Sequence, residues 1–226
     1  MTDLRLVRAN GIRLAYRESG SPAATPVVLL HALGENSADW DPVAAALSET
    51  WHVYAPDLRG HGRSDWPGAY TLALLRDDVL GFLDALELPR AAMIGHSMGG
   101  AAAYLLAIRQ PGRVTRLVLE EPAPPWPRVP RVPARPPGPL PFDWAVTRLS
   151  AEASHPPESS RAGLAAITAP TLIVAGGPDS QVSQDRLADM AALIPDARLV
   201  TIPAGHLVHA ARPEAFLSAV TGFLGS

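Results

Sequence analysis

Residues 91–108 read Ala-Ala-Met-Ile-Gly-His-Ser-Met-Gly-Gly-Ala-Ala-Ala-Tyr-Leu-Leu-Ala-Ile. An apolar run leads into the pentapeptide Gly95-His-Ser-Met-Gly99, and a helix-forming run follows it. A serine in G-x-S-x-G between a strand and a helix is typical of a sharp turn that exposes the serine Oγ at the positive end of the helix. Glycine is needed at both ends of the pentapeptide because side chains there would clash with their neighbours. The pattern predicts that Ser97 is an exposed nucleophile.

On either side of this turn, the chain alternates between strand-like and helix-like segments. Two alternating runs, 4–9 and 12–17, flank Asn10-Gly11, which is the strongest short hairpin signal. Further strands are expected at 26–31, 52–56, 91–94, 115–120, 171–175 and 198–202. Helices are expected at 38–50, 71–88, 98–109, 142–150, 183–193 and 213–224. The alternation predicts an α/β fold: a mostly parallel sheet with an N-terminal antiparallel hairpin and helices on both faces.

A proline-rich segment interrupts this pattern. Half of the 20 residues from Pro122 to Pro141 are proline, which disfavours helix and sheet and favours an extended chain on the surface. We therefore expect a single domain over residues 1–226, with residues 122–160 inserted over the sheet as a short lid. We expect Trp126, Phe142 and Trp144 to wall the substrate pocket, because large apolar side chains on an irregular segment must be buried somewhere. The alternative is a passive linker.

Composition narrows the chemistry and the partners. The net charge is −3, so neither nucleic acid nor an anionic membrane is expected as a partner. All 19 basic residues are arginine, which excludes lysine-based mechanisms, and the absence of cysteine excludes disulfides and thiolate chemistry. No His, Asp and Glu group has the spacing of metal ligands, so no metal is expected. The N-terminus lacks a signal-peptide core, and no run reaches the ~20 apolar residues of a membrane span. We expect a soluble cytoplasmic protein.

A serine nucleophile requires a base, and the base requires an acid to orient it. His206 lies in Gly205-His-Leu-Val-His209, on the loop after the last predicted strand. That position is at the carboxyl ends of the strands, the edge that also carries Ser97. The sequence leaves two positions open for the acid. One is Asp179, which follows the strand at 171–175, and the other is Glu121, or Glu120 beside it, at the end of the preceding strand.

Four motifs together resemble the α/β-hydrolase fold superfamily, and within it the small serine esterases, lactonases and C–C hydrolases. The motifs are His31-Ala-Leu-Gly34, Pro56-Asp-Leu-Arg-Gly-His-Gly-Arg-Ser64, Gly95-His-Ser-Met-Gly-Gly100 and Gly205-His-Leu-Val-His209. The resemblance implies that Ser97 is the nucleophile and His206 the base. It also implies an oxyanion hole formed by the backbone amides of Leu33 and Met98, which suits the need for two donors at the developing oxyanion. It favours Asp179 as the acid, because the family usually places the acid in such a Gly-x-x-Asp loop.

Other polar residues of these motifs are expected to be structural. Asp57, Arg59 and His61 are expected to tie loops together in a buried network near the site. For His31, His96 and His209, we expect hydrogen bonds that hold loops, and not proton transfer.

Together these features predict a serine hydrolase that cleaves a small ester, thioester or lactone through an acyl-enzyme on Ser97. No cofactor is expected, the partner is a small-molecule substrate, and the protein is expected to be a monomer or homodimer. The same fold, with the same serine, histidine and acid, also suits a C–C bond hydrolase, an acyl transferase, or a cyclase or lyase, because the fold alone does not decide the reaction. A non-catalytic ligand receptor on the same scaffold is a third possibility.

Overall fold

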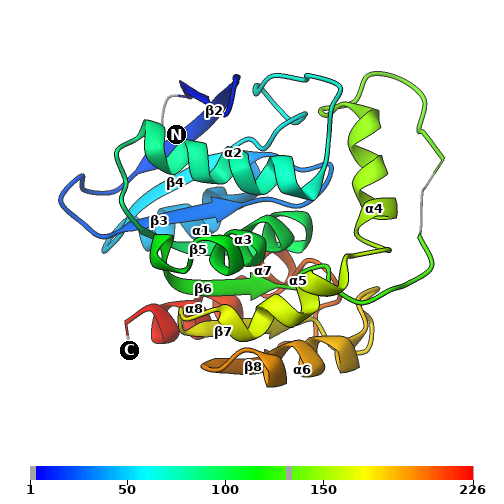
Figure 1. Ribbon diagram of the computed structural model, residues 1–226. Helices are drawn as coiled ribbons and strands as arrows, with labels where there is room; N and C mark the ends of the chain where they lie inside the picture. The colour runs from blue at the N-terminus through cyan, green and yellow to red at the C-terminus, as the bar shows by residue number, and fades with distance from the viewer. Residues whose placement is uncertain (1–3, 131–133, 226) are drawn as a thin grey trace.

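An eight-stranded sheet in the order β1-β2-β4-β3-β5-β6-β7-β8 forms the centre of the computed structural model, which describes residues 4–130 and 134–225 (Figure 1). The strands are β1 Arg5–Ala9, β2 Ile12–Ser19, β3 Pro26–Leu30, β4 His52–Pro56, β5 Ala91–His96, β6 Val114–Glu120, β7 Thr171–Ala175 and β8 Ala197–Thr201. The pairs β1–β2 and β2–β4 are antiparallel, and the other pairs are parallel. The predicted fold class is confirmed, including the hairpin at Asn10-Gly11.

Helices cover both faces of this sheet. The α-helices are α1 Asp41–Leu47, α2 Leu72–Ala85, α3 Ser97–Arg109, α4 Arg148–Glu152, α5 Glu158–Ala162, α6 Gln184–Leu193, α7 Val208–Ala211 and α8 Pro213–Leu224. The 3-10 helices are η1 Ser37–Trp40, η2 Pro111–Arg113, η3 Trp144–Thr147 and η4 Gly163–Ala166. No helix in the described part of the chain is long and apolar enough to cross a membrane.

The sheet separates two hydrophobic cores. Along β3, Val28 and Leu30 face the core formed with α2, α3 and α6, whereas Val27 and Leu29 face the core formed with α1 and α8. Successive strand residues point to opposite faces, so a strand buried on both sides must be apolar throughout. This explains why the central strands appear in the sequence as continuous apolar runs.

Some helix boundaries differ from those predicted. The helix expected at 38–50 is divided into η1 and α1, and Pro42 occupies the first turn of α1, where proline is tolerated. The helix expected at 142–150 is divided into η3 and α4. The short helices α5 and α7 were not predicted, because four or five residues are too few to show helical periodicity.

The proline-rich segment lacks helix and strand at 122–130 and 134–141, as predicted. Its first residues, however, are buried and not on the surface: Trp126 is only 8% exposed and belongs to the core that contains α6. The guanidinium of Arg186 on α6 lies 5.5 Å from the centre of the Trp126 ring. The chain reaches the surface only beyond this point, where Val129 is 85% exposed. The described parts of the segment loop out past the sheet before the chain returns as α4 (Figure 1).

A buried ion pair anchors the loop after β4 to helix α2. Arg59 donates through Nε and Nη2 to the two carboxylate oxygens of Asp78, each at 2.6 Å. The side-chain amide of Asn10 in the hairpin turn adds a third hydrogen bond to Asp78, at 2.8 Å. Asp78 is fully buried and Arg59 is 4% exposed. Three distant segments therefore meet at one carboxylate.

We expect Asp78→Asn to destabilise the fold by about 3 kcal/mol, because it leaves the guanidinium of Arg59 buried without its counter-charge. The matched control is Asp65→Asn, which removes an exposed ion pair with Arg13 of 2.8 Å and should destabilise the fold far less, because solvent screens exposed pairs. Urea denaturation of the parent and both variants measures the two losses. Equal losses would show that burial of the Arg59 pair contributes nothing.

Candidate active site

Ser97 occupies a strained turn, or elbow, between β5 and α3. Its φ is +50°, a left-handed conformation that costs a non-glycine residue about 1–2 kcal/mol. A Cβ on Gly95 would lie 2.7 Å from the backbone of Gly100, and one on Gly99 would lie 2.3 Å from the carbonyl oxygen of Leu30. Both glycines are therefore required by backbone contacts, as predicted. The turn places Ser97 at the carboxyl end of β5 and at the N-terminus of α3.

The loop that carries His206 is tied to the residue before Ser97. His96 Nε2 lies 2.8 Å from the carbonyl oxygen of His206, and the centres of the two rings are 4.7 Å apart. Because a carbonyl can only accept, His96 donates from Nε2. The structure thus brings the elbow and the histidine loop together at one edge of the sheet, where sequence analysis placed both.

His206 pairs with Glu121. Its Nδ1 lies 3.4 Å from Oε2 of Glu121, the residue that directly follows β6. The Glu121 carboxylate is fully buried. It also accepts hydrogen bonds from the backbone N–H of Gly176 at 2.5 Å, from Nε2 of Gln184 at 3.1 Å and from the hydroxyl of Ser180. Burial alone would raise the pKa of Glu121, but the hydrogen bonds from His206, Ser180, Gly176 and Gln184 together hold it below its usual value.

The predicted preference for Asp179 is not supported by this geometry. Asp179 lies exposed on the loop after β7, and within residues 4–130 and 134–225 no hydrogen bond or ion pair joins it to His206. The loop instead supplies donors: the N–H of Gly176 and the hydroxyl of Ser180 both point to Glu121. A carboxylate that already occupies this position leaves no place for a second one beside the same imidazole nitrogen. The structure therefore favours the alternative acid, Glu121.

Ser180 and Gln184 were missed by the sequence analysis. They belong to the turn after β7 and to the first residue of α6, and neither lies in a recognisable motif. Each contacts a carboxylate more than 50 residues away in the chain. Only the parallel pairing of β6 with β7 brings them to Glu121.

Two neutral histidines hold the loop that carries Leu33. His31 accepts the N–H of Leu58 at Nε2, at 2.8 Å, and its Nδ1 lies 2.7 Å from the carbonyl oxygen of Ala32. His61 accepts the N–H of Gly34 at Nε2, at 3.1 Å. Burial lowers the pKa of His31 well below its usual value and that of His61 to about 4. Since each ring accepts at one nitrogen, both work as neutral imidazoles, which confirms their expected structural role.

The predicted oxyanion donors, Leu33 and Met98, lie on this loop and on α3. Met98 is the second residue of α3, so its N–H is one of the first four that a helix leaves without an intrahelical partner. Leu33 is half-buried between the anchored residues His31 and Gly34. The assignment of both amides to an oxyanion hole remains a prediction.

The rest of the charged turn is a buried network, as expected. The carboxylate of Asp57 accepts the backbone N–H groups of Ser37 and Arg63, each at 2.8 Å. Ser64 donates to the carbonyl oxygen of Asp57 at 2.5 Å and accepts the N–H of Ala15 at 2.9 Å. Together with the Arg59 pair, these bonds fix the loop on which His61 sits.

The titration of His61 should make the fold sensitive to acid. Its pKa is about 4 in the folded chain, because burial outweighs a smaller opposing effect of the Arg59 carbonyl, and about 6.5 in the unfolded chain. The unfolded state therefore binds more protons between these values. The stabilisation is complete above pH 6.5 and is lost as the pH falls toward 4. We expect His61 to account for about 2 kcal/mol of stability lost between pH 7 and pH 5.

The variant His61→Gln tests this expectation, because a glutamine can still accept the N–H of Gly34 but does not titrate. Urea denaturation at pH 7 and pH 5 should show a smaller acid-induced loss for the variant than for the parent. An identical loss in both chains would assign the acid sensitivity to other groups.

Among the residues expected to wall a pocket, Phe142 lies closest to this loop. Its ring stacks on His61 at 5.6 Å with a 17° angle between the planes. A Cβ on Gly34 would touch it at 3.4 Å. Trp144 packs against Phe142 with ring centres 6.0 Å apart, whereas Trp126 lies in the core near α6. A role of the three aromatic residues in binding substrate remains a prediction.

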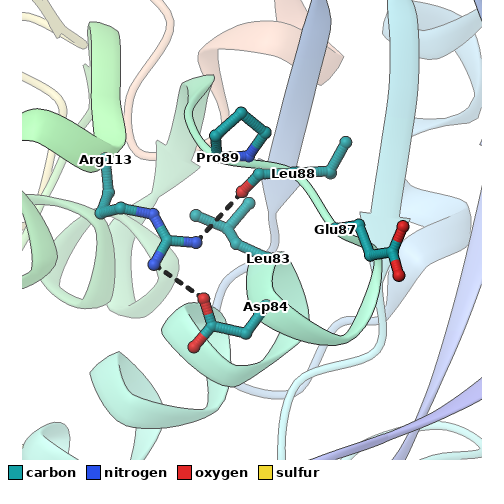
Figure 2. Close-up of a pocket in the computed structure, with 6 residues that line it drawn as sticks. All are labelled: Leu83, Asp84, Glu87, Leu88, Pro89 and Arg113. Atoms are coloured by element: carbon teal, nitrogen blue, oxygen red, sulfur yellow. Dashed lines mark hydrogen bonds and ion pairs between the residues drawn. The ribbon is translucent and has the colours of Figure 1, made fainter.

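A shallow hollow lies at the other end of the strands, away from Ser97 and His206 (Figure 2). Arg113 there bridges Asp84, at 2.7 Å, and the carbonyl oxygen of Leu88, at 3.0 Å. These residues precede β5 and β6, so the hollow lies at the amino ends of the strands. Ligands of parallel sheets bind at the carboxyl ends, and we assign the hollow no part in the site.

Comparison with known proteins agrees with this architecture. Residues 25–156 match the model of the alpha/beta hydrolase fold family. The 3-oxoadipate enol-lactonase 1 of Acinetobacter baylyi is 30% identical over 258 aligned residues, which cover 99% of this chain and 97% of that protein. The crystal structure of the enol-lactonase from Burkholderia xenovorans LB400 superposes with a TM-score of 0.86 and 27% identity, covering 98% of this chain and 100% of that one. The chain belongs to the α/β-hydrolase fold family.

Other relatives match only part of the chain. The putative carbamate hydrolase RutD of Caulobacter vibrioides is 43% identical over 110 residues, which cover 47% of this chain and 41% of that protein. An uncharacterized protein of Mycobacterium tuberculosis is 39% identical over 117 residues, and the match spans 34% of its length. The chain thus spans well under half the length of these relatives. The high identity to these relatives is confined to about half of this chain. It agrees with the α/β-hydrolase fold but does not identify a substrate.

Proposed function

We propose that this protein is a serine hydrolase that cleaves a small carboxylic ester, thioester or lactone through an acyl-enzyme on Ser97. The observation that carries the proposal is the pairing of Glu121 with Nδ1 of His206, on a loop held by His96 beside the strained elbow. A buried, charged carboxylate fixes the tautomer of a histidine and stabilises its protonated form. That is the requirement for a base that must accept a proton from serine.

In the proposed reaction, His206 removes the hydroxyl proton as Ser97 Oγ attacks the acyl carbon. The amides of Leu33 and Met98 bind the oxyanion of the tetrahedral intermediate, each contributing about 3 kcal/mol. When the intermediate collapses, the bond to the leaving oxygen breaks and His206 returns the proton to it. Water activated by the same histidine then attacks the acyl-enzyme and releases the acid. Glu121 stays ionised throughout and compensates the charge of the imidazolium.

The names of two relatives favour a lactone as the substrate of this protein. The full-length relative from Acinetobacter baylyi and the structural neighbour from Burkholderia xenovorans are both named as enol-lactonases. In a lactone the leaving oxygen stays attached to the acyl group, so acyl transfer opens the ring and a single product leaves. The same steps apply to open-chain esters. We therefore expect hydrolysis of both classes.

The first test is hydrolysis of p-nitrophenyl esters from acetate to decanoate, alongside a set of five- and six-membered lactones. Covalent labelling of the protein by a p-nitrophenyl phosphonate, mapped by mass spectrometry, should place the label on Ser97. Similar rates on short and long acyl chains would fit a short, open lid. A folded parent that neither turns over any of these compounds nor takes up the label would contradict the proposal and favour a non-hydrolytic protein.

A further inference from the structure

Behind the His206 loop, three polar atoms from distant segments point at one another. They are Oδ2 of Asp39 on η1, Nδ1 of His96 at the end of β5, and Nε2 of His209 on α7. Ligand atoms of the three residues lie within 4.8 Å of one another. His209 Nε2 and Asp39 Oδ2 form an ion pair of 3.2 Å when the histidine is protonated, whereas the buried Nδ1 of His96 has no hydrogen-bond partner within the described part of the chain. Buried polar atoms are normally hydrogen-bonded, so a free imidazole nitrogen beside this pair needs an explanation.

The other nitrogen of each imidazole is already engaged. His96 directs Nε2 to the carbonyl oxygen of His206 at 2.8 Å. His209 directs Nδ1 to the carboxylate of Glu120 at 2.8 Å, and its backbone N–H donates to the same carboxylate. Histidines that bind metals almost always donate their second ring N–H to a carboxylate or a carbonyl, which fixes the ring and its tautomer. Both histidines have this outer partner, and it leaves their inner nitrogens facing the carboxylate of Asp39.

The electrostatic environment favours a cation. Glu120 is fully buried and Asp39 is only 17% exposed, so two carboxylates flank the ring of His209. A cation held at the inner nitrogen of His209 would therefore be compensated by both carboxylates.

We propose that Asp39, His96 and His209 form a binding site for a first-row divalent cation such as Zn²⁺. Two imidazoles and one carboxylate are a donor set that suits this ion, with a water molecule as the fourth ligand. The 3.2 Å between His209 Nε2 and Asp39 Oδ2 is close to the edge of a tetrahedral site, about 3.3 Å for bonds near 2.0 Å. The longer separations require the side chains to close slightly around the ion.

Neighbouring residues hold the three side chains in place, and one of the three is accessible to solvent. The ring of Trp40 stacks on His209 with centres 4.4 Å apart and a 28° angle between the planes. Asp39 provides the route from solvent, because its side chain is the partly exposed member of the three. A bound ion would join η1, β5 and α7 at one point and so hold the loop of His206 from behind. The role is structural, and the ion takes no part in the acyl transfer proposed above.

The experiment uses the full chain, stripped with a chelator and checked for residual metal by mass spectrometry, and titrates it with Zn²⁺. Calorimetry should show one ion per chain, and the melting temperature should rise with Zn²⁺. Co²⁺ should give the strong visible absorption of a four-coordinate ion with nitrogen and oxygen ligands. In Asp39→Asn, which keeps the side-chain volume at a partly exposed position, we expect the affinity to fall at least tenfold.

A matched control removes a histidine outside the cluster. His155 is exposed and bonds to the carbonyl oxygen of Ala151 on the preceding helix, α4, so His155→Asn should bind Zn²⁺ like the parent. A second site variant, His209→Gln, should lose the Co²⁺ spectrum, with circular dichroism reporting whether it folds. The proposal is overturned if the stripped parent binds no Zn²⁺ at 100 µM, or if Asp39→Asn binds it with the affinity of the parent. The same variants leave Ser97 and Glu121 intact, so failure here would not touch the proposed hydrolase.

Discussion

Replacing Ser97 with alanine is expected to lower kcat for p-nitrophenyl ester hydrolysis by about 10⁵–10⁶, because the acyl-enzyme can no longer form. A slow residual reaction should survive, since the predicted oxyanion donors and the substrate pocket act without the nucleophile. The fold should persist. Alanine lacks the hydroxyl but keeps the Cβ that the φ of +50° already accommodates. Initial rates of parent and variant, with circular dichroism of both, measure the effect.

The matched control for this variant is Ser48→Ala. Its hydroxyl bonds to the carbonyl oxygen of Ala45 at the end of α1, and its loss should leave kcat within about twofold of the parent, as for surface changes in general. If Ser97→Ala keeps more than a few per cent of the parental kcat, the elbow serine is not the nucleophile. The chemistry would then have to be assigned to other residues of the site.

Replacing Glu121 with glutamine should lower kcat by about 10³–10⁴, the second-largest effect we expect. Glutamine keeps the length of the side chain but removes the charge that compensates the His206 imidazolium and fixes its tautomer. It also weakens the hydrogen bonds from Gly176 and Ser180, which are stronger when the acceptor is charged. The KM should change little, because Glu121 is fully buried behind the histidine.

The comparison variant is Asp179→Asn, for which we expect kcat within about twofold of the parent, since this exposed side chain does not pair with His206. Both variants should be measured on the same ester, across a pH series. A larger loss in Asp179→Asn than in Glu121→Gln would return the role of the acid to the loop after β7. It would also mean that the loop rearranges when substrate binds.

Much of this site could be predicted because its constraints are local. The elbow needs glycines before and after Ser97, and both are visible in five residues of sequence. The position of His206 follows from the order of strands, because the loop after the last strand must lie at the carboxyl edge. The choice of acid could not be settled this way. Asp179 and Glu121 both follow strands at that edge, and the φ of +45° that turns Glu121 toward His206 leaves no trace in the sequence.

The burial of the proline-rich segment also lies beyond sequence patterns. Proline excludes regular structure but does not determine exposure, and Trp126 is buried because α6 happens to lie beneath it. Sequence patterns also could not reveal the cluster of Asp39, His96 and His209. Its members are separated by more than 50 residues in the chain, and their meeting depends on the sheet order.

The consecutive glutamates Glu120, which ends β6, and Glu121, which directly follows it, limit how this part of the chain can change. Glu120 accepts the backbone N–H of His209, and Glu121 pairs with His206. Inserting one residue before them would move both carboxylates by one position. Glu120 would then occupy the place of Glu121 beside His206, and His209 would lose its carboxylate. The end of β6 should therefore resist any change in length.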